Sequence, residues 1–458
     1  MCQTKYRKKT SKYTWDSDSD PIERYIVIGN GFDLECNLPT SYSQYLSFIE
    51  FHEVLFQWFQ GIFERDTVAS NYHNMYGEYV YPDYKETSLQ SVLDKYKSSI
   101  NQLVFDALNP LSNIDTCYQD HISSESYNYT QATNRLSYKW QNNFVNFQVS
   151  GSNFWYQHFH PICTGRGWID FENEIARLIR LIEDSMVAEP GHRRYLDNEV
   201  VTEYPSDLSK LMESPLGYTT LSENIDARGT NLRYRRYRYT YRELRKRLLD
   251  DLNDLTRGLE TYLRDYVGAI DPTMTPAIED IVHTVKTCNK SFVISFNYTK
   301  TLQDILAKQG TDAEFCYVHG QLGDGKDKNR MVLGIDEYLN SDEVRTRTDF
   351  ASFRKYNQRI FKETDSSYRN WIAAIESQKD IPRELVIFGH SLGITDQDIL
   401  RSLITAPNMR TVIYYHDEDA FSEKLANITA ILGMDYVIER TGGEMHTLKF
   451  EQQKQPKP

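Results

Sequence analysis

The sequence lacks paired cysteines, long apolar stretches and a surplus of positive charge, and each absence excludes a class of protein. Its 458 residues include only six cysteines, none of them in a CxxC pair, so we expect neither a disulfide framework nor a structural zinc site. No uninterrupted apolar run approaches the ~18 residues that span a bilayer. The first 20 residues are polar and contain no apolar segment of the secretory-signal type. We therefore expect a cytoplasmic protein with no membrane association and no bound metal.

The charge and composition are those of an acidic, folded protein. The formal net charge is −13, which argues against a generic nucleic-acid coat or a membrane-surface protein. Hydrophobic residues make up 40% of the chain and charged residues 26%, which is a globular composition. A chain of this length is expected to form one large elaborated domain or two to three domains.

Short buried strands and helices alternate in the last third of the chain. Apolar runs occur at 291–296, 314–318, 330–334, 384–388 and 410–415, with another ending near Ile438. Helical patterns separate several of these runs, at 299–308, 352–376, 395–405 and 420–431. This alternation predicts βα units and a mainly parallel sheet. The run 24–28 has the same character, so we expect it to join that sheet.

The sequence between residues 51 and 290 has a different, mostly helical pattern. Its clearest helix is 240–266, in which leucines recur at helical spacing. We therefore expect a doubly wound, mainly parallel, Rossmann-like α/β core interrupted by a large helical insertion. The expected divisions are a flexible extension at 1–20, the core at 21–50 and 291–445, the insertion at 51–290 and a tail at 446–458.

Ligands of doubly wound sheets bind beyond the carboxyl ends of the strands, so the residues after each run are candidates. The strand at 24–28 is followed by Gly29-Asn30-Gly31-Phe32-Asp33. Glycine permits a close approach of backbone amides to a phosphate or ribose, and Asp33 can bond a hydroxyl or orient a water. A plain tight turn, which also needs glycine, is the alternative interpretation.

Two further strand ends have polar residues. Asn297 follows the run 291–296, where its amide is well placed to bind a ligand or to cap the helix that starts at Thr299. His319 follows the run 314–318 and precedes a glycine. Histidine is the usual general base near neutral pH, and its position at a strand end favours function over a structural role.

The run 384–388 is followed by Gly389-His390-Ser391-Leu392-Gly393, which matches the G-x-S-x-G nucleophile elbow. Asp417 and His446 follow in the order of an α/β-hydrolase triad. Against a serine hydrolase, Asp396 and Asp398 lie beside the serine, and His446 is in a segment without an anchoring pattern. The alternative is a glycine turn in which Ser391 donates to a phosphate or ribose.

Arginines and tyrosines interleave between Arg233 and Arg247. Such a segment suits contact with a nucleic-acid backbone and stacking on bases. We favour the alternative of a solvated helix start on an acidic protein.

Seven motifs, taken in their order and spacing between about residues 21 and 440, resemble the bacterial abortive-infection AbiH family. They are IGNGFDL at 28–34, LPTSYS at 38–43, WIDFE at 168–172, SFNYT at 295–299, VHG at 318–320, FRK at 353–355 with Gln358, and FGHSLG at 388–393 with Asp396. That family in turn resembles the sirtuin-like NAD-hydrolysing domains of bacterial antiphage defence.

The resemblance implies a sirtuin-like nucleotide site and a role for each motif. The glycine loop would bind the dinucleotide phosphates, Asn297 would position the nicotinamide ribose or the attacking water, and His319 would be the general base. Asp33 would be a third catalytic residue, because a carboxylate stabilises the charge that develops when a glycosidic bond breaks. The residues that would bind the nucleotide are Gly29, Asn30, Gly31, Phe32, Gly389, Ser391 and Asp396.

The activity implied is hydrolysis of NAD, or a related nucleotide, to nicotinamide and ADP-ribose, with NAD as substrate and no further cofactor. Loss of NAD would stop the growth of an infected cell. Asp33 replaces the serine of the sirtuin-like GAGxS loop, and Thr299 replaces the aspartate of N-Y-D. The alternatives are a serine hydrolase that uses Ser391 and a nonenzymatic sensor of nucleic acid or a phage protein. A homo-oligomer or a partner defence protein is also expected.

Overall fold

The computed structural model describes most of the chain in two compact units. The described residues are 21–76, 89–113, 136–147, 149, 153–166, 170–185, 221–225, 231–235, 241–323, 329–335, 350–442 and 446–455. The first unit contains the residues up to Thr40, the segment Glu172–Ile179 and the chain from Asp271 onward. The second contains Ser41–Phe171 and Arg180–Ile270. Within the described residues, none of the helices is long and apolar enough to cross a membrane.

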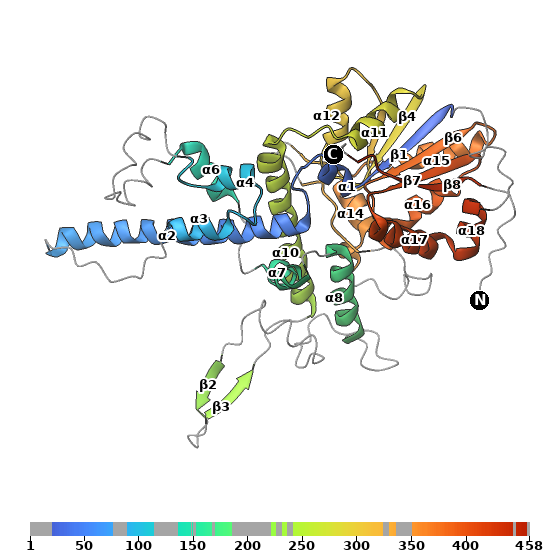
Figure 1. Ribbon diagram of the computed structural model, residues 1–458. Coiled ribbons are helices and arrows are strands. Elements are labelled where there is room, and N and C mark those ends of the chain that lie inside the picture. Colours follow the sequence, from blue (N-terminus) through green and yellow to red (C-terminus); the bar gives the residue numbers. More distant parts are fainter. Residues whose placement is uncertain are drawn as a thin grey trace. The chain divides into compact units, whose positions relative to one another are not determined.

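The first unit is built on a six-stranded sheet whose neighbouring strands are all parallel (Figure 1). The strand order across the sheet is β5-β4-β1-β6-β7-β8. In chain order this is 3-2-1-4-5-6, the order of a Rossmann-type doubly wound sheet. The predicted fold class is therefore confirmed. The strands are β1 (Glu23–Ile28), β4 (Lys290–Ser295), β5 (Glu314–Tyr317), β6 (Arg383–Phe388), β7 (Met409–Tyr415) and β8 (Leu448–Gln452).

Helices flank this sheet, and most follow the predicted patterns. The predicted helix 352–376 is in fact two helices, because Glu363 adopts the left-handed conformation (φ 53°) that ends α14. The helices of this unit are α1 (Asn30–Glu35), α11 (Pro276–Lys286), α12 (Thr301–Lys308), α14 (Lys355–Lys362), α15 (Tyr368–Ser377), α16 (Gln397–Ile404), α17 (Glu418–Leu432) and α18 (Met434–Gly442).

Three sequence-based assignments in this unit are wrong. The apolar run 330–334 is not a strand: it is a buried irregular segment, because the Gln358 side chain and the His319 carbonyl meet its backbone groups. The run near Ile438 belongs to helix α18. Residues 446–458, predicted as a tail, include the edge strand β8, whose alternation of Leu448 and Phe450 with charged residues is typical of such a strand.

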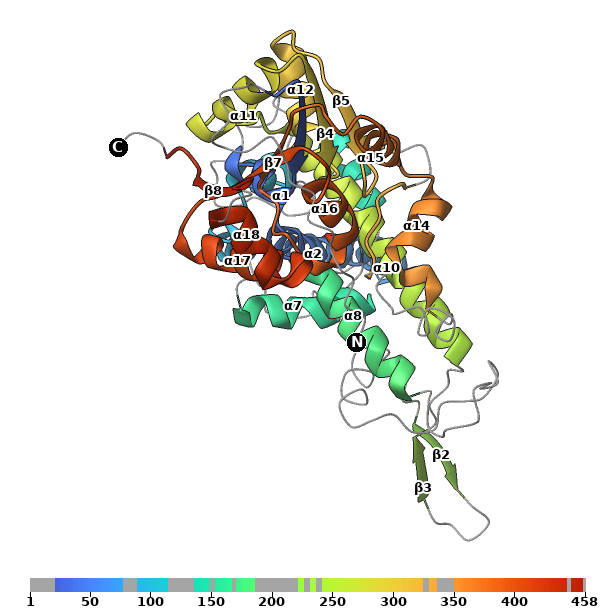
Figure 2. The ribbon, with the colours of Figure 1, turned by 90° about the vertical axis from the view of Figure 1, so that its right-hand side faces the viewer.

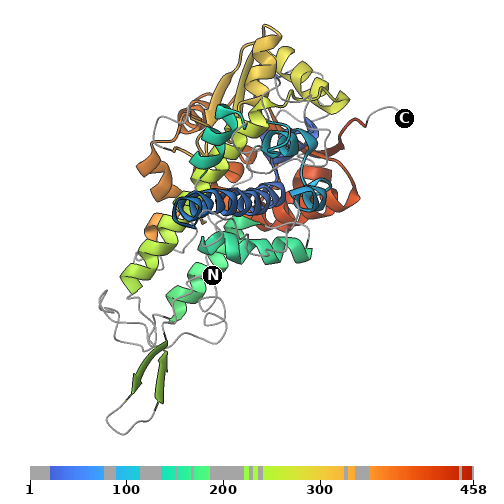
Figure 3. The ribbon, with the colours of Figure 1, turned by 90° about the vertical axis from the view of Figure 1, so that its left-hand side faces the viewer.

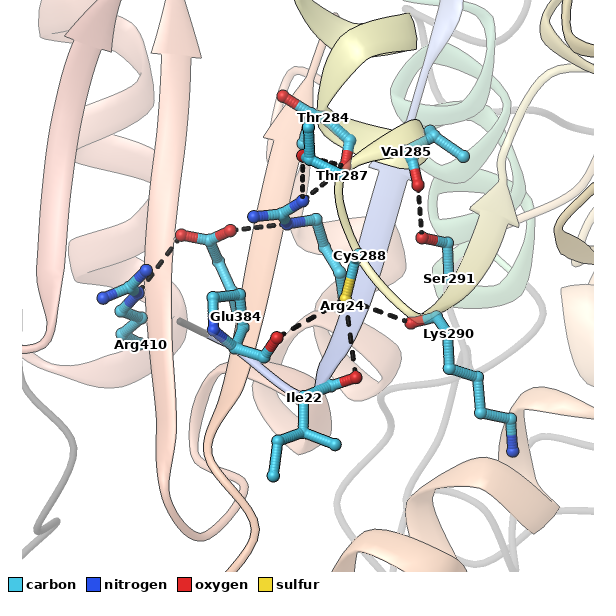
Figure 4. A network of polar contacts seen from close by, with 11 residues as sticks. Ile22, Arg24, Thr284, Val285, Thr287, Cys288, Lys290, Ser291, Glu384 and Arg410 are labelled. Carbon is cyan, nitrogen blue, oxygen red and sulfur yellow. Dashed lines mark hydrogen bonds and ion pairs between the residues drawn. The ribbon is translucent and has the colours of Figure 1, made fainter. Parts of the chain in front are cut away.

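The amino-terminal ends of the central strands are tied by a row of charges (Figure 4). Arg24 on β1 pairs with Glu384 on β6 (2.6 Å), and Arg410 on β7 pairs with the other oxygen of Glu384 (3.2 Å). These residues face one another in the strand register. On the neighbouring row, Arg383 pairs with Glu23 at 2.7 Å. The two rows lie at the edge of the sheet opposite its carboxyl ends.

The second unit is mainly helical. Its leucine stripe is confirmed, since Leu244, Leu248, Leu252, Leu255 and Leu259 are all buried on α10. The insertion also contains a two-stranded antiparallel hairpin (Figure 2), which the helical prediction missed. The 35-residue helix α2 is the blue helix of Figures 1 and 3. The elements are α2 (Tyr42–Tyr76), α3 (Leu89–Tyr96), α4 (Gln102–Leu108), α6 (Tyr138–Asn146), α7 (Phe154–Arg166), β2 (Leu221–Ile225), β3 (Asn231–Arg235) and α10 (Tyr241–Thr261).

Helix α8 (Phe171–Ser185) is divided between the two units: its Glu172–Ile179 segment belongs to the first and its last turns to the second. Helix α11, predicted as part of the insertion, belongs to the first unit.

Candidate functional site

The loops after β1 and β6 touch at the point where the strand order reverses. The Gly31 amide donates to the Gly389 carbonyl (2.8 Å). A Cβ on Gly31 would lie 2.7 Å from the Gly389 Cα, and a Cβ on Gly389 would lie 2.2 Å from the Phe32 nitrogen. Both glycines are therefore required for this close backbone approach.

The glycine loop has few free amides of its own. The Phe32 amide donates to the Gly29 carbonyl (2.9 Å), and the Gly31 amide is taken by Gly389. Asn30 is exposed beside them. Binding of a nucleotide by Gly29, Asn30, Gly31 and Phe32 stays a prediction, in which Asn30 is the residue best placed for contact.

Replacing Gly389 by alanine is expected to destabilise the protein by about 3 kcal/mol or more. Alanine would be strained in the left-handed conformation of this residue, and its Cβ would also clash with the backbone of Phe32. Gly389 has φ 66°. The measurement is the free energy of unfolding in urea. Gly393→Ala is the control, since its Cβ would meet nothing closer than 3.5 Å. Equal effects of the two substitutions would contradict the role assigned to Gly389.

Asp33 lies on α1 with its carboxylate sealed from solvent; the residue is 1% exposed. The Thr299 hydroxyl donates to its Oδ2 at 2.5 Å, whereas Oδ1 has no hydrogen-bond partner. Burial raises the pKa of Asp33 to about 6, against the opposing effect of the Thr299 and Thr301 hydroxyls and the Asn297 amide. The group is thus a buried carboxyl with a raised pKa and one oxygen without a hydrogen-bond partner.

Asn297 follows β4 and is 5% exposed. Its amide lies near enough to Asp33 to favour the ionised carboxylate, but neither its Oδ1 nor its Nδ2 makes a hydrogen bond of normal geometry. A buried amide left unpaired costs on the order of 1–3 kcal/mol. The helix-cap interpretation is wrong, because α12 begins at Thr301 with Lys300 as its N-cap. Binding of a ligand by this unpaired amide stays a prediction.

His319 follows β5 and is buried against the edge of the Phe296 ring. Its Nε2 lies 3.0 Å from Oδ1 of Asp396. The positive charge of Lys355 and hydrogen bonding from His319 and His390 hold the pKa of Asp396 well below its usual range, against the effect of burial. The ionised carboxylate therefore accepts, and Nε2 of His319 carries the proton. Burial and the charge of Lys355 lower the pKa of His319 to about 4. His319 is therefore neutral at pH 7, with its lone pair on Nδ1.

Asp396 is the centre of a buried ion network that also includes Lys355 and Glu172. The Lys355 ammonium, fully buried on α14, lies 2.7 Å from Asp396 Oδ1 and 2.7 Å from Glu172 Oε2. The Thr395 hydroxyl donates to the same Glu172 oxygen (3.0 Å). Asp396 was predicted to bind the nucleotide; the structure gives it a second role as the partner of His319.

Lys355 was not among the predicted site residues, and no role was predicted for Glu172. Lys355 lies in the motif FRK and Glu172 in the motif WIDFE. In the fold, Lys355 contacts both Glu172 and Asp396. A buried lysine requires such carboxylate partners, so the presence of a lysine in one quoted motif and of a glutamate in another was the available signal.

The loop after β6 is held from several sides and leaves Ser391 exposed. The His390 Nδ1 accepts from the Leu392 amide (2.9 Å), and the ring edge contacts Phe296. The Lys424 ammonium donates to the His390 carbonyl, and Asn427 donates to the Ser391 carbonyl. Gly389 and Ser391 thus lie at the switch point, where their predicted contact with a nucleotide stays a prediction.

The contacts of Ser391 and Asp417 do not support the serine-hydrolase alternative. Among the described residues, its side chain makes no hydrogen bond with a histidine. Asp417, the expected acid, instead caps helix α17 by accepting from the Ala420 amide (2.8 Å).

The arginine and tyrosine segment is only partly described, since residues 236–240 lie outside the described residues. On α10, Arg247 pairs with Asp251 at 3.0 Å, one helical turn away. Asp251 itself is buried, but Arg242, Lys246 and Arg247 are exposed, which favours the interpretation of a solvated helix start. Binding of nucleic acid stays a prediction.

Comparisons with known proteins extend this description. No curated protein and no solved structure matches the chain. The family model described as bacteriophage abortive infection AbiH matches residues 25–415, a range that runs from within β1 to the end of β7 and includes all the groups of the site. The chain belongs to the AbiH family.

Proposed function

We propose that this chain acts in antiphage defence by hydrolysing the N-glycosidic bond of NAD or a closely related nucleotide. The family supports the part in abortive infection. The observation that supports the reaction is the pair formed by Asp33 and Asn297. At the carboxyl ends of β1 and β4, it offers one carboxylate oxygen and a whole amide group with no partner.

The charge of this pair selects which part of a nucleotide binds there. Asp33 is an anion above pH 6, so it repels phosphates and attracts a group that is hydroxylated or positive. In NAD the nicotinamide ribose meets both conditions, since it has two hydroxyls and a pyridinium. The Asn297 amide, with one donor and one acceptor side, suits a ribose diol.

The reaction breaks the C1′–N1 bond, and the electron pair goes to the nicotinamide nitrogen and neutralises the pyridinium. Positive charge moves to the ribose carbon, where the Asp33 carboxylate stabilises it better than in the ground state. Water then adds to C1′ and gives up a proton. The neutral His319 imidazole, with its lone pair on Nδ1, is the base for that proton.

The resemblance to sirtuin-like domains supports the same assignment. It rests on the glycine loop, the asparagine after a strand, the histidine–glycine pair and the late glycine–serine loop. Asp33 takes the place of the serine in the sirtuin-like loop. On this proposal the substitution adds a carboxylate to the pocket and does not abolish the activity. Silencing by a homo-oligomer or a partner protein fits an effector that must stay inactive before infection.

The proposal is tested by incubating the purified chain with a panel of nucleotides and identifying the products by mass spectrometry. We expect release of nicotinamide from NAD, and a loss of about a hundredfold or more in Asn297→Ala and in His319→Ala. The controls are Asn370→Ala and His416→Ala, which change exposed residues of the same types. In parallel, the NAD content of cells that express each variant is measured before and after phage infection. NAD that stays intact in both settings, or full activity in either site variant, would overturn the proposal.

A further inference from the structure

We propose that Lys355 is a positioning residue that keeps His319 a neutral base with Nδ1 as its acceptor atom, by holding Asp396 against the opposite ring nitrogen. The catalytic use of His319 rests on the proposed function. The protonation state of His319 does not depend on the proposed function. The role of Lys355 and the proposed function can therefore be disproved separately.

The geometry that supports this role is the sharing of one oxygen. The Lys355 ammonium and the His319 Nε2 both contact Oδ1 of Asp396, at 2.7 and 3.0 Å. A carboxylate oxygen that receives two donors is fixed in place, and it fixes the imidazole in turn. His319 can then present only Nδ1 to an incoming proton.

The charges around His319 come from four elements. Asp396 precedes α16, Lys355 and Arg359 lie on α14, Glu172 lies on α8, and His390 follows β6. The His390 Nδ1 accepts from a backbone amide, and its Nε2 lies 3.6 Å from Oδ2 of Asp396. Lys355 is the fully buried cation between the two carboxylates.

Without Lys355 the charge around His319 would become negative. The buried Asp396 and the partly buried Glu172 would be two neighbouring anions, and His319, 3.0 Å from Asp396, is in place to neutralise this charge. The imidazole would take a proton on Nδ1, pair with Asp396 as a cation, and lose the lone pair that accepts a proton. Lys355 therefore acts on the base without touching the substrate.

The test compares Glu172→Gln with the double variant Glu172→Gln/Lys355→Met. The double variant removes one anion together with the cation, so that a protonated His319 leaves the site neutral and the fold is kept. The readout is the nitrogen NMR of histidine-labelled protein between pH 5 and 8, with the His319 signals assigned by their loss in His319→Gln. Circular dichroism confirms that each variant is folded.

We expect the wild type and Glu172→Gln to show the neutral Nε2–H form of His319 across this range. The double variant should show the imidazolium form, with a midpoint at least one pH unit higher. Its rate of NAD hydrolysis at pH 7 should fall in proportion to the fraction of His319 that is protonated there, with KM little changed. An Nδ1–H form in the wild type, or identical titrations in both variants, would overturn the proposal. A shifted titration in a protein that hydrolyses no nucleotide would overturn only the proposed function.

If the double variant does not fold, Asp396→Asn replaces it. This variant removes the carboxylate that Lys355 holds, and the fixed Nε2–H form should give way to a mixture of the two neutral forms. Retention of the single Nε2–H form would contradict the role assigned to the network.

Discussion

Replacing Asp33 by asparagine is expected to stabilise the fold by about 2–3 kcal/mol at pH 8 and to reduce hydrolysis of the nucleotide about a thousandfold. The pKa of Asp33 is about 6 in the folded protein, against an ordinary value of 3.8 for an aspartate in water. Folding at pH 8 therefore buries a charge that the unfolded chain keeps in water. Asparagine removes that charge and can still accept the Thr299 hydrogen bond.

The sign of the pH dependence follows from the raised pKa. Protonated Asp33 is favoured in the folded state, so the stability associated with it is fully present below pH 3.8 and is lost as the pH rises through 6. The advantage of Asp33→Asn should thus be largest at pH 8 and vanish near pH 4. Unfolding in urea at pH 8, 6 and 4 measures it. Hydrolysis by the wild type should show an acid limb near pH 6.

Asp304→Asn is the matched control, since Asp304 is an exposed aspartate in the first turn of α12. It should change stability by no more than about 0.5 kcal/mol and leave hydrolysis unchanged. A destabilisation by Asp33→Asn of equal size at all three pH values would show that Asp33 has a purely structural role.

Replacing Glu384 by glutamine is expected to destabilise the protein by about 3 kcal/mol or more. Glu384 is the buried acceptor between Arg24 and Arg410. Its neutral isostere would remove the anion that lies between two largely buried guanidinium groups. The measurement is the free energy of unfolding in urea at pH 7.

The control for this prediction is Glu451→Gln on β8, whose ion pair with Lys449 (2.9 Å) is exposed. An exposed pair contributes about 0–1 kcal/mol. Hydrolysis by Glu384→Gln, measured below the unfolding temperature, should be unchanged because the charge row lies at the far edge of the sheet. Similar stabilities of the two variants would mean that the buried row contributes little.

The sheet could be predicted because strands buried on both faces are continuous apolar runs. The same signal was misleading at 330–334, where a buried irregular segment has the same composition and only the fold reveals that Gln358 satisfies its backbone. Edge strand β8 was missed for the opposite reason. Its solvent-facing residues are charged, so it has no apolar run.

The site could be predicted only where residues follow strands. The positions of Asp33, Asn297 and His319 at carboxyl ends follow from the topology of a doubly wound sheet. Lys355 and Glu172 lie on helices, separated by 183 positions in sequence, and their roles depend on a meeting that no local pattern encodes. The titration near pH 6 of Asp33 likewise arises from burial, which the residue type alone does not reveal.

Strand β8 sets a limit on how the protein can be shortened. It pairs with β7 along Thr411–Tyr415 and covers that strand's outer hydrogen-bonding groups. A truncation after Gly442 would open β7 as an unprotected edge, and such edges recruit strands of other molecules. Affinity tags are therefore better joined beyond Gln455 with a spacer than substituted for the last residues, and aggregation of a truncated chain would reflect this edge rather than a fault in the site.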